Sequence, residues 1–449
     1  MTLDDVRPYD PTRVEHLGDS AIVIGGGMAG LLAARVLIDA FESVTVLERD
    51  PLDAPLGPRN GTPQASHVHV MLEAGRAILE TLEPGYQADV VGAGGLCIDA
   101  GSDLQYFHHG AYLQAPDTTL PMLCASRPLF EYVLRERVRD RDGITFRGEC
   151  SFQTYVVDGT PPRVTGISYR DSNGESATMG ADLVVDATGR ASRTARWLDE
   201  VGYPRPDVEE VGIDLAYSSM MVERPPDTVD GFLVVPTSPN CRGGTVVPIE
   251  DERWVVTLFG LHGDHPPGDP AGFAEFARSL ATAEPADILE RHQSVNAGVH
   301  QYPFPANRRY RYDDLDAFPR GLLVTGDAIA SFNPIYGQGM SVAALDALHL
   351  HIALTEPTLE DIADRYFPAV ANTIDVIWRM TVGADFGYPD TTGSAPIGTR
   401  AFNWYLERLV KTAHRDGVAT DAFARVLRLE HSPTRLLAPS LLWRVLAPP

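Results

Sequence analysis

Cysteine, lysine and long apolar runs are all scarce in this sequence, and each scarcity narrows the possible functions. The 449 residues include four cysteines, Cys97, Cys124, Cys150 and Cys241, without CxxC or HxxxH spacing. This pattern argues against a zinc site or a disulfide framework and favours buried free thiols. Lys411 is the only lysine, so lysine enters almost no catalytic argument. No apolar run reaches the roughly eighteen residues that a membrane-spanning helix needs.

Positive charge is also in deficit. The chain has 37 lysines and arginines against 61 aspartates and glutamates, a formal net charge of −24. Such a charge repels phosphate backbones and anionic membranes, so we expect no nucleic-acid partner and no stable membrane insertion. The first residues, MTLDDVRPYDPTRVEHLGD, lack the basic and apolar regions of a secretory signal, so we expect a cytoplasmic location.

The order of apolar runs and turns predicts several cooperating units, which the length of the chain allows. From Ser20 the sequence reads as a strand, a glycine turn, a periodic helix and a second strand, which is a βαβ unit. A single strand is predicted over 144–158. Short apolar runs alternating with turns over 211–261 predict a mostly antiparallel sheet, followed by two helices over 270–293. The C-terminal part reads mainly as helices.

The first turn of the βαβ unit carries a dinucleotide fingerprint. Gly25, Gly27 and Gly30 satisfy GxGxxG, and an acid stands at the end of the next strand, where it can bind a ribose hydroxyl. Glycines permit the tight turn and let a diphosphate approach the amides at the helix start. The fingerprint does not separate NAD from FAD. The residues predicted to form this part of the site are Gly25, Gly27, Met28, Ala29, Gly30, Glu48 and Arg49.

A second glycine-rich stretch lies far along the chain, GLLVTGDAIASFNPIYGQGMSVAALDA. It resembles the second FAD-binding motif of group A flavoprotein monooxygenases, which share the fold of para-hydroxybenzoate hydroxylase. The resemblance implies that Asp327 binds the ribityl or pyrophosphate part of FAD and that Pro334 borders the isoalloxazine. It also implies a helix start facing the pyrimidine edge of the flavin, formed by Gly337, Gly339, Met340 and Ser341. Many family members have asparagine where this chain has Ser341.

Two further segments extend the resemblance. CASRPLFEYVL is similar to the arginine-led helix of the family and implies that Arg127 lies near the ribityl or phosphate part of FAD. VVDATGRASRTARWL takes the place of the DG motif, which contacts pyrophosphate and pyridine nucleotide. It departs from the family pattern around Asp186 and Arg190.

The segment RNGTPQASHVHVML is similar to polyether epoxidases of the monensin and lasalocid type, and this similarity implies roles for Arg59 and Gln64 in cofactor binding. His67 and His69, two residues apart, would share one face of a strand. With no third ligand near in sequence they predict packing or hydrogen bonding rather than a metal site. Phe332 and Tyr336 could line a substrate pocket or belong to the core.

Together these features predict an α/β fold. It consists of a Rossmann-like FAD-binding domain interleaved with a mostly antiparallel β-sheet substrate domain, plus C-terminal helices. The predicted boundaries are 15–205 for the first part of the FAD-binding domain, with a substrate-domain insertion near 85–120. The substrate domain follows over 206–300, the second part of the FAD-binding domain over 301–355, and the helical region over 356–449.

The resemblance implies an FAD-dependent monooxygenase, either a hydroxylase or an epoxidase. Such an enzyme acts through a flavin C4a-hydroperoxide in a pocket that excludes water. With one nucleotide fingerprint, NAD(P)H would be a transient reductant without a Rossmann domain of its own. The implied substrate is a bulky apolar secondary metabolite, polyketide-like. No catalytic acid or base is assigned, and the chain is expected to be a monomer or homodimer.

Other functions remain open at the level of sequence. Dialkyldecalin synthases share the fold and catalyse a redox-neutral [4+2] cyclisation with FAD as a structural element. A flavin halogenase is disfavoured because the WxWxIP signature is absent and the single lysine lies in the C-terminal helices. A geranylgeranyl-reductase-like enzyme and a non-catalytic binding protein are the weaker alternatives.

Overall fold

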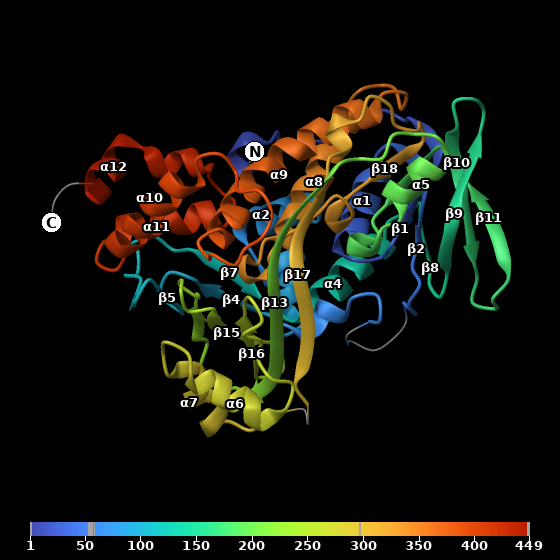
Figure 1. Cartoon of the computed structure of the whole chain (residues 1–449). Coiled ribbons are helices and arrows are strands. Elements are labelled where there is room, and N and C mark those ends of the chain that lie inside the picture. The colour runs from blue at the N-terminus through green and yellow to red at the C-terminus, as the bar shows by residue number, and fades with distance from the viewer. Residues whose placement is uncertain (1, 53–56, 58, 296–297, 447–449) are drawn as a thin grey trace.

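The computed structural model describes residues 2–52, 57, 59–295 and 298–446. Figure 1 shows long central strands, a helical region that ends in the C-terminus on one side and a small separate sheet on the other. The predicted fold class is confirmed, since a parallel sheet with helices, a mostly antiparallel sheet and C-terminal helices are all present.

A five-stranded parallel sheet forms the nucleotide-binding layer. Its order is β18 (Leu322–Val324), β12 (Leu183–Asp186), β1 (Gly18–Ile24), β2 (Phe41–Leu47) and β8 (Ile144–Arg147), with every pairing parallel. The inner strand β12 and the edge strand β18 are buried throughout, as expected when helices cover both faces of a parallel sheet. Strands from distant parts of the chain meet here, and this sheet therefore brings the two glycine-rich stretches together.

Three helices pack around this layer. Helix α1 (Met28–Leu37) follows β1 directly, and it contacts both α4 (Arg127–Arg139) and α8 (Gly339–Leu354). Helix α8 is apolar on all sides and almost fully buried, since it also packs against α2 (Glu73–Leu82) and α9 (Ile362–Asp385). The N-termini of α1 and α8 are thus held in one rigid core.

An eight-stranded sheet forms the second layer. Its order is β19 (Ala330–Ser331), β17 (His300–Tyr310), β13 (Val208–Glu223), β16 (Arg253–Gly260), β15 (Arg242–Ile249), β14 (Gly231–Val234), β5 (Leu104–His108) and β6 (Ala111–Tyr112). All pairings are antiparallel except β14 with β5. Strands from the segment near 85–120 and from beyond residue 300 complete this sheet. The domain boundaries themselves stay predictions.

Helices α6 (Pro270–Arg278) and α7 (Glu284–Arg291) cover one face of this sheet, where Phe273 and Phe276 pack against Trp254 and Leu258. The two predicted helices over 270–293 are therefore found. Figure 1 places them at the bottom of the view, apart from the C-terminal helices α10 (Thr399–Ala413), α11 (Gly417–Leu427) and α12 (Pro439–Leu446), which have an apolar cluster of their own.

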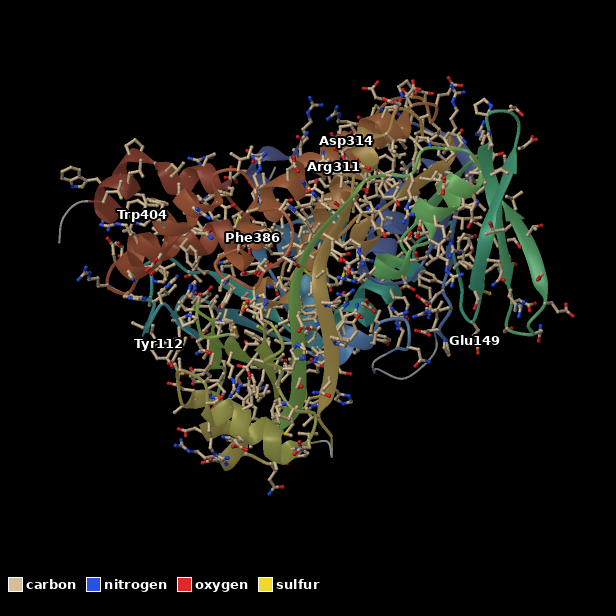
Figure 2. The ribbon with its side chains drawn as sticks, in the orientation of Figure 1. Tyr112, Glu149, Arg311, Asp314, Phe386 and Trp404 are labelled. Atoms are coloured by element: carbon tan, nitrogen blue, oxygen red, sulfur yellow. The ribbon has the colours of Figure 1, made fainter. Side chains whose placement is uncertain are left out.

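The single strand predicted over 144–158 is wrong. The chain instead forms β8 in the parallel sheet and β9 (Ser151–Asp158) in a separate antiparallel sheet with β10 (Arg163–Arg170) and β11 (Ser176–Gly180). Glu149, labelled in Figure 2, has φ +56°, so the backbone turns out of the extended conformation between the two strands. A third small sheet contains β3 (Val70–Met71), β7 (Pro121–Cys124) and β4 (Leu96–Asp99).

The cysteines differ in part from expectation. All four are unpaired, and Cys124 and Cys150 are buried, but Cys97 is exposed and Cys241 is partly exposed. The strand β4 that carries Cys97 is only partly covered, which explains the exposure. Within the described parts of the chain, no helix is both long and apolar enough to cross a membrane.

Candidate functional site

The turn between β1 and α1 has two kinds of glycine. Gly25 has φ +107°, and a side chain there would meet the carbonyl oxygen of Ala187 at 2.6 Å. At Gly30 a Cβ would lie 1.8 Å from the carbonyl oxygen of Gly25. Both glycines are therefore required by packing. Gly27, the N-cap of α1, is different, because a Cβ there would approach only one described atom, Oε1 of Glu131, at 3.6 Å.

Open space therefore lies beside the first turn of α1, where backbone amides have no partner within the helix. Met28 is buried and Ala29 packs against Gly326, so these residues can offer amides to a ligand but not side chains of their own. Such a helix start favours a phosphate group.

Glu48 stands at the end of β2, as predicted, and the chain already holds its carboxylate. Oε2 accepts a hydrogen bond from the Gly26 amide at 2.8 Å and pairs with Arg59 Nη1 at 2.9 Å, while Oε1 accepts from the Asp50 amide at 3.0 Å. Arg49 is exposed and donates to the carbonyl of Asn60 at 3.2 Å. Contacts within the chain thus fix the position of the Glu48 carboxylate, whereas the Arg49 side chain holds the neighbouring loop.

Glu131 links two of the predicted arginines and was not found from the sequence. Its Oε2 lies 2.6 Å from Arg59 Nη2, and its Oε1 lies 2.7 Å from Arg127 Nη2. Burial raises the pKa of Glu131, but Arg127 and Arg59 outweigh that effect, so the pKa lies below its usual value. The spacing of Arg127 and Glu131, four residues apart on one helix, is the only sequence signal for this pair. Gln64 lies nearby in a short helical turn, Pro63–Ser66, that contacts α4.

Asp327 follows β18 and is exposed, although its neighbours Gly326 and Ala328 are buried. Surrounding protein nevertheless raises the pKa of the Asp327 carboxyl group, and Arg127 and Arg190 act in the opposite direction. A side chain that is accessible and yet desolvated faces a recess rather than the outer surface. Arg190 is held on the other side by hydrogen bonds to Ser331 Oγ at 2.9 Å and to the carbonyl of Ala306 at 2.8 Å.

The start of α8 also combines exposed residues with buried neighbours. Pro334 and Gly339 are exposed and residues 335–337 are partly exposed, while Asn333, Gln338 and Met340 are buried. Gly337 has φ +66°, which turns the chain into the helix, and a Cβ on Gly339 would meet no described atom within 4 Å. We call the space next to Gly27, Asp327, Pro334 and Gly339 the cofactor recess.

Ser341 does not face this recess with its side chain. It is fully buried, and a Cβ on Gly75 of α2 would lie 2.6 Å from its Oγ. The hydroxyl group is therefore packed against α2. Any contribution of Ser341 to a cofactor comes from its backbone, as it does for the buried Met340.

These features fit FAD. The recess has the amide-rich start of α1 at one end, the start of α8 at the other, and Asp327 beside two arginines in its wall. A long dinucleotide with a diphosphate in its middle needs amides and arginines near the diphosphate and close backbone approach at its ends. Contacts link five of the predicted cofactor residues, because Glu131 lies next to Gly27 and pairs with Arg59 and Arg127, Arg59 pairs with Glu48, and Arg127 acts electrostatically on Asp327. Pro334, Gly337 and Gly339 lie together in the turn that leads into α8.

Asp186, which lies in the segment that takes the place of the DG motif, forms hydrogen bonds within its own turn. Its carboxylate accepts hydrogen bonds from the amide and Oγ1 of Thr188 at 2.9 and 2.6 Å, from Ser192 Oγ at 2.6 Å and from Thr194 Oγ1 at 2.5 Å. The side chain is buried and fully engaged, so it shapes the turn whose Ala187 carbonyl packs against Gly25. It is not free to contact a cofactor.

The two histidines have separate partners. His67 Nδ1 forms a hydrogen bond with Ser219 Oγ at 2.7 Å, and burial lowers the pKa of His67 to about 3. His69 donates from Nδ1 to the His67 carbonyl at 3.0 Å, and burial, aided by Arg127, lowers its pKa to about 4. Both imidazoles are neutral at neutral pH. Strand β3 begins after them, so the predicted shared strand face is wrong, although hydrogen bonding near the recess is found.

Asp385, at the end of α9, is a buried acid that sequence reasoning missed. Its carboxylate accepts hydrogen bonds from Asn307 Nδ2 at 2.8 Å, from Asn333 Nδ2 at 2.8 Å and from the Tyr336 hydroxyl at 3.4 Å. Burial raises the pKa of Asp385 to about 6. No signal in the sequence connects residues so far apart. Phe332 is buried against Trp378 and belongs to the core, whereas Tyr336 is partly exposed.

Three tyrosines from different elements lie near this acid. Tyr106 on β5 and Tyr388 after α9 both act electrostatically on Tyr336, and burial raises the pKa of all three phenols. Tyr388 donates to the carbonyl of Asn240 at 3.2 Å. The eight-stranded sheet, the turn before α8 and the C-terminal region thus meet beside the recess.

Comparison with known proteins agrees with this geometry. The model of a family described as FAD binding domain matches residues 19–366. Protein Rv3254 of Mycobacterium tuberculosis (strain ATCC 25618 / H37Rv) is 32% identical over 429 residues, which cover 92% of this chain and 90% of that protein.

Solved structures share the fold at low identity. The flavin-dependent brominase Bmp2 is 15% identical (TM-score 0.63, covering 92% of this chain and 94% of that chain). The p-nitrophenol 4-monooxygenase PnpA of Pseudomonas putida DLL-E4 is 17% identical (TM-score 0.61, 93% and 99%). The Diels-Alderase PyrE3 of pyrroindomycin biosynthesis is 20% identical (TM-score 0.56, 92% and 81%). With a family match over most of its length, the chain belongs to the FAD-binding-domain family.

Proposed function

We propose that this protein is an FAD-dependent monooxygenase, a hydroxylase or epoxidase, that acts on a bulky apolar secondary metabolite, polyketide-like. The observation that carries the proposal is the cofactor recess, which has two helix starts, Asp327 and two nearby arginines but almost no reactive side chain at its α8 end. When bound, FAD supplies the redox chemistry, accepting a hydride from NAD(P)H and activating O2. The chain then needs only to bind, orient and exclude water.

The residues divide these tasks among themselves. The amides of the first turn of α1, with Arg59 and Arg127, would hold the diphosphate, and Glu48 would accept from the ribose. Asp327 would accept from the ribityl hydroxyls. The amides at the start of α8 would stabilise negative charge at the pyrimidine edge of the flavin, because they point from a positive helix terminus.

Several finer points belong to the same proposal. NAD(P)H would be a transient reductant, because the chain has one dinucleotide fingerprint. A kinship with polyether epoxidases rests on the RNGTPQASHVHVML segment, and its arginine, Arg59, contacts Glu48 and Glu131 beside the recess. We also propose a cytoplasmic monomer or homodimer.

The test begins with a visible spectrum of the purified protein and stopped-flow mixing with NADPH or NADH. We expect a yellow protein whose flavin is bleached by a pyridine nucleotide and restored by air. With a library of apolar polyketides, one member should accelerate NAD(P)H consumption and gain one oxygen atom from 18O2. A flavin that neither nucleotide reduces, or turnover of a substrate without oxygen, contradicts the proposal.

A redox-neutral [4+2] cyclase is the second candidate. It is supported by the shared fold with the Diels-Alderase PyrE3, over 92% of this chain. In that case substrate conversion should continue without reductant or oxygen, and the product should have the mass of the substrate. Halogenation is less well supported despite the fold shared with Bmp2, because Lys411 is 54% exposed on α10 and pairs with Glu407 at 2.6 Å. No lysine can therefore act in the recess.

A further inference from the structure

Asp385 takes no part in the function proposed above, and yet its surroundings are unusually specific. The side chain is 2% exposed, and no charged side chain contributes to its electrostatic environment within the described ranges. Its neighbours are two amides, Asn307 from β17 and Asn333 from the turn before α8, and the phenol of Tyr336. Burial of a carboxylate without a cation costs free energy unless hydrogen-bond donors surround it, as they do here.

The two amides cannot be turned around. Asn307 Oδ1 accepts from the backbone amide of Asn333 at 2.6 Å, so its Nδ2 must point to Asp385. Asn333 Oδ1 accepts from the amide of Ile335 at 3.1 Å, so its Nδ2 must also point to Asp385. Backbone donors thus determine both orientations, and position 385 must present two acceptors.

Asn333 transmits this constraint to the cofactor recess. It caps the short helix Pro334–Tyr336, which leads into Gly337 at φ +66° and then into α8 at Gly339. Pro334 and Gly339 are two of the residues that define the recess. The carboxylate of Asp385 therefore determines the position of a turn whose exposed side faces the place expected for the flavin ring.

We propose that Asp385 is a positioning residue that holds the turn from Asn333 to Gly339, and the phenol of Tyr336, in register with the bound flavin. The inference deepens the proposed function and rests on its flavin site, but it does not depend on oxygen transfer or on the identity of the substrate. Asp385 acts through Asn333 and Tyr336 and contacts no reacting atom.

The first experiment compares Asp385→Asn with Asp364→Asn, which replaces an exposed acid on the same helix. In Asp385→Asn an amide donor faces an amide donor, and the turn must shift. We expect a roughly tenfold higher dissociation constant for FAD, measured by flavin fluorescence, and a changed flavin absorbance band in the holoprotein. Asp364→Asn should leave both unchanged. The melting temperature of each apoprotein reports stability separately from these readouts.

A swap of the two groups gives the sharper test. Asn333→Asp alone places two carboxylates together and should also weaken FAD binding. Combined with Asp385→Asn, the new carboxylate at position 333 can accept from Ile335 and from the new amide at position 385, whose oxygen still accepts from Asn307. We expect the double variant to recover most of the FAD affinity and the wild-type spectrum, because donors and acceptors again match.

Two results would overturn the proposal. One is a folded Asp385→Asn holoprotein with an FAD dissociation constant within about twofold of wild type and an unchanged spectrum, since a lost buried hydrogen bond should cost more. The other is a double variant no better than the single ones. If Asp385→Asn does not fold, recovery of folding and flavin spectrum together in the double variant supports the proposal, and recovery of folding alone contradicts it. A failed monooxygenase assay leaves these readouts unaffected, so the two proposals fail separately.

Discussion

Arg59 Nη2 lies 2.6 Å from Glu131 Oε2, and this contact joins the loop after β2 to helix α4. The same carboxylate holds Arg127, so one buried acid orients both arginines that we assign to the diphosphate. Its position explains how a strongly acidic chain can keep positive charge beside an anionic cofactor.

Glu131→Ala should therefore damage both stability and cofactor binding. Removal of Glu131 leaves Arg127 without its carboxylate and Arg59 with Glu48 alone, and it should lower the free energy of unfolding by roughly 3 kcal/mol. Urea denaturation of the apoprotein measures this value, and flavin fluorescence should show weaker FAD binding. Glu136→Ala, which replaces a partly exposed acid on the same helix, serves as the control. Equal stability of the two variants would contradict the role of Glu131.

Gly339→Ala tests where the flavin lies. A Cβ there meets no described atom within 4 Å, so the apoprotein should keep its melting temperature. If FAD fills that space, the methyl group should raise the dissociation constant about tenfold, since close backbone approach is lost. Gly92→Ala, at another position where a Cβ has no neighbour within 4 Å, is the matched control. Unchanged FAD affinity in Gly339→Ala would place the flavin elsewhere.

His67 should make folding sensitive to acid. Its pKa is lowered from 6.5 to about 3 by burial, so the unfolded chain binds the proton first as the pH falls. The stability contribution is complete above about pH 6.5 and is lost toward pH 3, with a slope of about 1.4 kcal/mol per pH unit for one proton. His67→Asn should remove one proton's share of that slope between pH 6 and pH 4, as chemical denaturation at each pH can show. An unchanged slope would mean that His67 binds its proton equally well in the folded and the unfolded protein, which would contradict the lowered pKa.

Asp346 should change the stability of the protein with pH in the opposite direction to His67. Burial raises its pKa from 3.8 to about 7, and its Oδ2 accepts from the Gly326 amide at 3.1 Å. The folded state therefore holds the proton more tightly, and the wild type should lose stability as the pH rises from about 4 to 7. Asp346→Asn keeps an acceptor for Gly326 and should be more stable than wild type at pH 8 but similar at pH 4. Thermal melts at both pH values check this, and a variant less stable at pH 8 would refute it.

The glycine turns and the acid at the end of β2 could be predicted because their partners lie close in the chain. Gly25 and Gly30 contact each other within one turn, and Glu48 reaches Gly26 from the adjacent strand of the same βαβ unit. The prediction of one strand over 144–158 is wrong because it also relied on local pattern alone. A backbone turn at Glu149 leaves little trace in hydrophobic periodicity, which looks alike before and after it.

The fold class and the FAD-binding family could be predicted from sequence, because each rests on a continuous pattern of glycines and apolar residues. The roles of the acids could be read only from the folded chain. Asp186 is consumed by its own turn, Glu131 orients two arginines, and Asp385 holds a turn fifty-two residues before it in the chain. Where a carboxylate is buried, its partners determine its charge and function, and those partners depend on which distant segments pack against it.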